Sequence, residues 1–132
     1  MKVVADTNVL VRIIMQDNEA QAKTAANLLR DAELITVGLP CLCEVVWVLS
    51  RTYKLSGERI AVAIRALLNT ANIVTNRPAA EAGLAVLDAG GDFADGVIAY
   101  EGYSLGGKTF VSFDKKAVSL LTEQGQAARL LA

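Results

Sequence analysis

Short apolar runs alternate with helix-length segments along the whole chain, and no other feature of the sequence restricts the fold as strongly. Runs of this kind are typical of strands in a parallel sheet, because such strands are buried between helices. We expect strands at residues 2–5, 34–37, 73–75 and 108–112, and a final edge strand at 128–131. Right-handed crossovers between them predict an α/β fold, a three-layer sandwich whose mainly parallel sheet has four or five strands and helices on both faces.

Capping residues and glycines mark the helices between these strands. We expect helices at residues 8–15, 19–30, 40–53, 56–70 and 78–87, another between 92 and 106, and a last one from about 114 to 124. Asn18 is a good N-cap for the second helix, Pro40 suits a helix start, and Gly90 with Gly91 suits a helix end.

The length and composition indicate one globular domain that covers residues 1–132. Hydrophobic residues make up 53% of the chain and the mean hydropathy is +0.37, so we expect more apolar surface than one small core can bury. This surface predicts a homodimer or a higher oligomer. Charges interrupt every apolar run before it reaches bilayer-spanning length, and the start of the chain does not resemble a signal peptide. We therefore expect a soluble, cytoplasmic protein with no membrane partner.

The absence of histidine narrows the possible chemistry. It removes serine-type triads, imidazole acid–base catalysis and histidine-ligated metals. Cys41 and Cys43 are the only cysteines and cannot complete a structural zinc site by themselves. The net charge of −1 argues against a broad electrostatic grip on nucleic acid, although not against chemistry on nucleic acid. Carboxylates, hydroxyls, amides, lysine and arginine must supply the reactive groups.

Four acidic residues occupy related positions in the expected fold. Asp6 follows the first strand, Asp114 follows the fourth, Asp95 enters a helix, and Glu44 lies early in the helix whose stretch 41–49 is otherwise apolar. We expect Glu44 to be buried, which is costly for a carboxylate unless it is paired or bound to a metal. We expect all four to reach the same edge of the sheet, where ligands bind in open α/β folds.

Clustered carboxylates repel one another unless a cation neutralises them. For a cluster with only oxygen ligands the ordinary cation is Mg²⁺ or Mn²⁺, and metal-assisted phosphoryl chemistry is the reaction class that follows. Three of these acids also have a purely structural interpretation when taken alone. Asp6 and Asp114 are good N-caps, and Asp95 suits the first turn of a helix. The functional interpretation depends on all four together.

With these motifs the chain resembles the PIN-domain nucleases, and among them the small VapC-type toxins of toxin–antitoxin pairs. The resemblance covers nearly the whole chain and depends on Asp6–Leu10, on Glu44 in its apolar helix, on Asp92–Ala99 and on Val111–Lys116. It implies that Asp6, Glu44, Asp95 and Asp114 are metal-binding acids of the catalytic site, with Asn8 and Ser112 as supporting polar residues.

The resemblance also implies an activity and partners. It implies a Mg²⁺- or Mn²⁺-dependent endoribonuclease that hydrolyses RNA phosphodiesters, works as a dimer and is held inactive by a cognate antitoxin protein. Ser112 stands where the family usually has threonine and keeps the hydroxyl. Lys115 and Lys116 follow Asp114 where a further acid is common in the family, so a fifth carboxylate is missing there. This leaves open whether one or two metals act. It also leaves open whether Asp92 replaces the missing carboxylate or only caps its helix.

Other protein classes fit the sequence less well. A haloacid-dehalogenase-like phosphatase needs a second aspartate two residues after the first, where this chain has Asn8. A receiver-type signalling module needs an aspartate after the third strand, where this chain has Thr75 and Asn76. A non-catalytic PIN-like binding module stays an alternative. Trp47 is expected in the core or at an interface, and Lys115 and Lys116 suit either phosphate contact or a solvated helix start.

Overall fold

The computed structural model describes all residues, 1–132, and these divide into two compact units. The first unit is Met1–Arg77 and the second is Pro78–Ala132. The chain forms seven helices and five strands in total. Each unit is described by itself.

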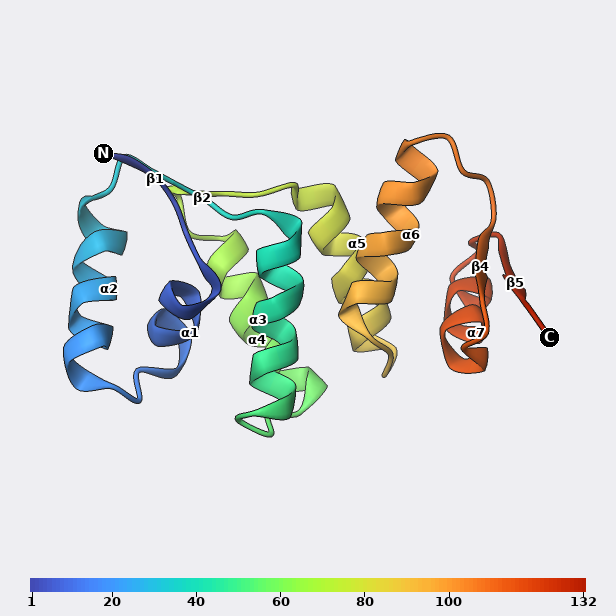
Figure 1. Ribbon diagram of the computed structural model, residues 1–132, viewed down its shortest axis with the longest axis horizontal. Helices are drawn as coiled ribbons and strands as arrows, with labels where there is room; N and C mark the ends of the chain where they lie inside the picture. The colour runs from blue at the N-terminus through green and yellow to red at the C-terminus, as the bar shows by residue number, and fades with distance from the viewer. The chain divides into compact units, whose positions relative to one another are not determined.

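The first unit contains a three-stranded parallel sheet and four helices (Figure 1). Its elements in order are β1 (Lys2–Val4), α1 (Thr7–Met15), α2 (Glu19–Asp31), β2 (Leu34–Thr36), α3 (Leu39–Arg51), α4 (Gly57–Leu68) and β3 (Ile73–Val74). The strand order is β1-β2-β3, with Val3 opposite Ile35 and Ile35 opposite Ile73. Helix α1 packs against α2 and α3, and α4 packs against α3 and β3.

The second unit contains a two-stranded parallel sheet and three helices, of which the first begins at the boundary with the first unit. Its elements are α5 (Arg77–Asp88), α6 (Phe93–Ser104), β4 (Phe110–Ser112), α7 (Lys115–Glu123) and β5 (Ala128–Leu130). Strands β4 and β5 pair through a crossover that contains α7, with Val111 opposite Arg129. Helix α7 packs against both strands.

The α/β class and the parallel pairing are confirmed, and the seven helices are consistent with the expected sandwich. The single sheet of four or five strands is not what the structure shows, because the strands pair as one sheet of three and one of two. Each sheet joins strands that are close in the chain and linked by one or two helices. Strands of two or three residues form few ladder hydrogen bonds, so the short connections within a unit decide which strands pair.

Strand β1 is less buried than its apolar sequence suggests. It lies at the edge of its sheet and pairs with β2 only, and the Val4 side chain is 83% exposed. The core of this unit lies instead between β2 and the helices. Its fully buried side chains include Leu10, Ile35, Leu42, Leu49, Ile60 and Ile64.

Local capping accounts for the helix starts. The side chain of Asn18 accepts a hydrogen bond from the Gln21 amide at 3.0 Å, and that of Ser56 accepts one from the Arg59 amide at 3.2 Å. Such bonds satisfy backbone amides that the first turn of a helix leaves free. Helix α5 ends at Asp88, and the turn after it contains Gly90, whose φ of +91° lies in the left-handed region that favours glycine.

The second unit has its own small core. Val86, Ala99 and Leu121 form its centre, and Tyr103, Phe110, Leu120 and Ala128 pack around them. Helices α5 and α6 approach each other closely at Gly96, where an added Cβ would lie 2.4 Å from the carbonyl oxygen of Ala82. No helix in either unit combines the length and the apolar character needed to cross a bilayer.

Candidate functional site

Asp6 lies at the carboxyl end of β1, as its position in the sequence predicts. Its Oδ1 accepts a hydrogen bond from the Thr7 amide at 2.7 Å, so Asp6 is the N-cap of α1. The side chain is otherwise exposed. The capping bond occupies one carboxylate oxygen, and the other can still bind a ligand.

Glu44 is exposed, and our expectation that it would be buried is wrong. Helix α3 buries the face formed by Leu39, Leu42, Val45, Val46 and Leu49. Glu44 lies on the opposite face together with Trp47, which is 60% exposed and therefore does not belong to the core. An exposed carboxylate is hydrated and needs no partner, so burial gives no argument that Glu44 binds a metal. An argument that Glu44 binds a metal must therefore come from the residues that lie near it.

Cys41 connects Glu44 with Asp6. It is half-buried in the first turn of α3, one helical turn before Glu44. Burial raises the pKa of the Cys41 thiol, and the nearby negative charges of Asp6 and Glu44 raise it further, against a hydrogen bond from Thr7 that lowers it. Both carboxylates therefore lie close to the same sulfur atom, which places two of the four predicted acids together in the first unit.

Three carboxylates lie close together in the second unit. Asp95 is half-buried in the first turn of α6, and its pKa is raised, first by burial and then by the negative charges of Asp92 and Asp114. Asp92 is the N-cap of α6 and accepts from the Ala94 amide at 3.0 Å. The sequence predicted Asp95 and Asp114 for the site. It left Asp92 undecided, and Asp92 both caps the helix and acts electrostatically on Asp95.

Two backbone amides and a serine hydroxyl hold the turn around Asp114. Its Oδ1 accepts hydrogen bonds from the amides of Lys116 at 3.0 Å and Ala117 at 3.2 Å, so Asp114 caps α7. The hydroxyl of Ser112 accepts a hydrogen bond from the Asp114 amide at 2.9 Å. Ser112 therefore orders the turn that carries Asp114. Lys115 and Lys116 are exposed in the first turn of α7.

Asn8, the other supporting residue that the resemblance implied, is exposed in the first turn of α1. It lines a mainly apolar groove of about 470 Å³ together with Val9, Arg12, Ala20, Gln21, Thr24, Ala25 and Leu28. The Nη1 of Arg12 donates hydrogen bonds to Oδ1 of Asp17 at 3.1 Å and to the hydroxyl oxygen of Tyr53 at 3.1 Å. The groove belongs to α1 and α2 and contains none of the four predicted acids.

Comparison with known families gives one match. A model of the PIN domain matches residues 3–120, which is most of the chain. The chain belongs to the PIN domain family. PIN domains are generally nucleases that bind nucleic acid, and they typically use divalent metals. No curated protein matches the chain.

The acids of this PIN domain fit a hard divalent cation by their chemistry. All are carboxylates, and the pKa of Asp95 is raised first by burial and then by repulsion from Asp92 and Asp114. A bound cation would remove this repulsion. Within neither unit do three Asp, Glu or Cys side chains form a group that could hold an ion by itself. Asp6 and Glu44 are the candidate ligands in the first unit, and Asp95 and Asp114 are the candidate ligands in the second.

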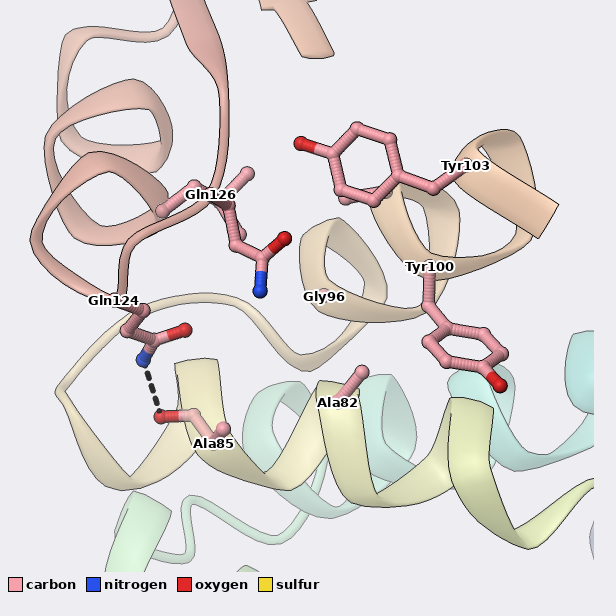
Figure 2. A pocket seen from close by; sticks show the side chains of 9 residues that line it. Ala82, Ala85, Gly96, Tyr100, Tyr103, Gln124 and Gln126 are labelled. Carbon is pink, nitrogen blue, oxygen red and sulfur yellow. Dashed lines mark hydrogen bonds between the residues drawn. The ribbon is translucent and has the colours of Figure 1, made fainter. Parts of the chain in front are cut away.

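A second hollow in this PIN domain lies apart from the acids. A cavity of about 100 Å³ lies in the second unit, and one of its lining residues, Gln124, donates a hydrogen bond to the Ala85 carbonyl oxygen at 3.0 Å (Figure 2). Its lining residues are Ala82, Ala85, Gly96, Ala99, Tyr100, Tyr103, Leu121, Gln124 and Gln126. It contains no acid, lysine or arginine, so it offers no charged group for chemistry on a phosphate.

Proposed function

We propose that this PIN domain is a metal-dependent endoribonuclease that hydrolyses RNA phosphodiesters, with Asp6, Glu44, Asp95 and Asp114 holding Mg²⁺ or Mn²⁺. The observation that carries the proposal is the half-buried Asp95, whose pKa is raised first by burial and then by the negative charges of Asp92 and Asp114. Perturbed carboxylates of this kind are typical of functional sites.

We also propose that the two units act as one domain, residues 1–132. The family match supports this, because it runs from residue 3 to residue 120 and crosses the boundary after Arg77. Each unit supplies two of the four proposed acids.

The side chains of this site would bind the ion and orient the substrate. A divalent cation in such a site activates a water molecule and stabilises negative charge on the phosphate. Asp114 is held by two backbone amides and by the turn that Ser112 orders, so its free oxygen has a defined direction. Asp6 is held in the same way by the Thr7 amide. Carboxylates fixed by the backbone lose little conformational entropy when they bind a cation.

We further propose that the protein is a VapC-type toxin, which acts in the cytoplasm as a homodimer and is neutralised by an antitoxin protein. The motif residues Asp6–Leu10, Asp92–Ala99 and Val111–Lys116 support this assignment. The exposed apolar side chains support protein partners, since monomers rarely expose many of them. They include Val4, Trp47, Val62, Ile98, Leu105, Val111 and Phe113.

The test is incubation of the purified protein with structured and unstructured RNA, with Mg²⁺ or Mn²⁺ and with a chelator. We expect cleavage that requires the ion and is lost in Asp6→Asn and Asp95→Asn. Asp31→Asn is the matched control, because Asp31 is an exposed acid of α2 that pairs with Arg30. Cleavage of DNA alone would refute the RNA assignment. Hydrolysis of a small phosphate ester, without cleavage of nucleic acid, would favour a phosphatase.

A further inference from the structure

The thiol of Cys41 bridges the two residues on either side of Asp6. The hydroxyl of Thr7 donates a hydrogen bond to the Cys41 sulfur at 3.7 Å. The Cys41 thiol donates in turn to the carbonyl oxygen of Ala5, also at 3.7 Å. Hydrogen bonds to sulfur are longer and weaker than those between oxygen and nitrogen, but here a single side chain makes both.

These two bonds restrict the peptide that carries Asp6. Ala5 is 6% exposed and Thr7 is 5% exposed, so both lie where water does not compete for their polar groups. Thr7 is the only polar residue that the structure buries, and Cys41 is the acceptor for its hydroxyl. Loss of this acceptor would leave a buried hydroxyl without its partner, which is unfavourable.

The same bonds connect Asp6 to Glu44. Cys41 lies in the first turn of α3, three residues before Glu44, and α3 packs against α1. Side chains three apart on a helix lie on neighbouring positions of one face. A bond from Cys41 to the segment around Asp6 therefore sets where α3 begins relative to β1, and with it the separation of the two carboxylates.

We propose that Cys41 is a positioning residue, which holds Asp6 and Glu44 at the spacing that metal binding requires. This inference rests on the proposed metal-dependent function. Groups that orient metal ligands without touching the metal typically change metal affinity or activity by about 10- to 100-fold when they are removed. Cys41 itself contributes no ligand and no proton to the reaction.

The experiment compares variants that separate hydrogen bonding from packing. Cys41→Val keeps an apolar side chain of similar size and removes both hydrogen bonds, whereas Cys41→Ser keeps a donor and an acceptor. Cys43→Val is the matched control, because Cys43 is a half-buried cysteine of the same helix. Mn²⁺ affinity is measured by titration calorimetry, RNA cleavage by kcat and KM, and folding by thermal denaturation.

We expect Cys41→Val to bind Mn²⁺ about 10- to 100-fold more weakly, with lower kcat and unchanged KM for RNA. It should still unfold cooperatively, at a Tm below that of the control because the Thr7 hydroxyl loses its acceptor. Cys41→Ser should recover most of the affinity. Thr7→Val combined with Cys41→Val should lose no more affinity than Cys41→Val alone, because Cys41→Val already removes the bond that Thr7→Val removes. If Cys41→Val fails to fold, the comparison of Cys41→Ser with Thr7→Val decides by the same measurements.

Two results would overturn the inference, and they differ. Wild-type affinity and kcat in Cys41→Val, or a serine variant as defective as the valine variant, would reject the positioning role while the nuclease assignment stands. A wild-type protein that neither binds Mn²⁺ nor cleaves RNA would reject the proposed function and the positioning role together.

Discussion

Alanine at Gly96 should force α6 away from α5. The new Cβ would lie 2.4 Å from the carbonyl oxygen of Ala82, 2.8 Å from the Ala82 carbonyl carbon and 2.8 Å from the Cα of Gly83. Ordinary contacts begin at 3.4 Å, so the shortest of these approaches is too close by 1.0 Å (3.4 − 2.4). All three atoms belong to the backbone of α5 and cannot rotate away as a side chain can. One helix must therefore move.

Gly102 in the same helix provides the matched control. A Cβ added there meets nothing within 4 Å. Gly102→Ala should stabilise the protein by about 0.5–1 kcal/mol, because alanine is the better helix former. Gly96→Ala gains the same helix propensity and adds the overpacking, which typically costs about 1–3 kcal/mol. The difference in unfolding free energy between the two variants therefore isolates the overpacking, and should be about 1–3 kcal/mol.

Urea denaturation followed by far-ultraviolet circular dichroism measures this difference, because the signal reports on all seven helices. Gly96 follows Asp95, so a displaced α6 should also lower metal-dependent cleavage in Gly96→Ala and leave it unchanged in Gly102→Ala. Equal stability of the two variants would refute the close approach of α5 and α6. Unequal stability with equal activity would show that Asp95 tolerates the displacement.

Three further outcomes follow from single side chains. Asn18→Ala removes the cap of α2 and should destabilise the protein by about 1 kcal/mol in urea denaturation, without loss of cleavage. Asp95→Asn should stabilise the metal-free protein at pH 7. A carboxyl pKa raised above 3.8 makes folding less favourable as pH rises through the folded pKa, and asparagine removes this effect. The gain in unfolding free energy should shrink as pH falls towards 3.8, and a gain independent of pH would show that the Asp95 charge is not its cause. Cys41 should react with iodoacetamide more slowly than a free thiol at pH 8, because its pKa is raised. It should react faster in Asp6→Asn than in the wild type, because the Asp6 charge contributes to raising that pKa. Equal rates in the two proteins, measured by mass spectrometry, would show that Asp6 does not act on the Cys41 thiol.

Features that depend on neighbours in the chain could be predicted from the sequence. The helix that begins after Asn18 and the strand at 128–130 lie within a residue of their expected positions. Asp6 and Asp114 cap helices directly after strands, as their order in the sequence indicates. The PIN domain was recognisable for the same reason, since its motifs are short runs that place an acid beside a strand or a helix start.

Features that depend on distant residues could not be predicted. Helix α3 is apolar on nearly all sides, so its sequence does not indicate which face is buried, and packing against α1 and α4 left Glu44 and Trp47 exposed. The strands are too short for their sequences to specify partners, and the structure paired them as three and two.

By itself the sequence determined the α/β class and the helix caps, because these follow from side-chain chemistry and from hydrogen bonds that span a few residues. Only the tertiary structure decided which acids act on one another and what holds them. Cys41 meets Thr7 and Ala5 across 34 and 36 residues of chain. Such a contact forms only after the strand and the helix have packed, so no pattern of neighbouring residues in the sequence predicts it.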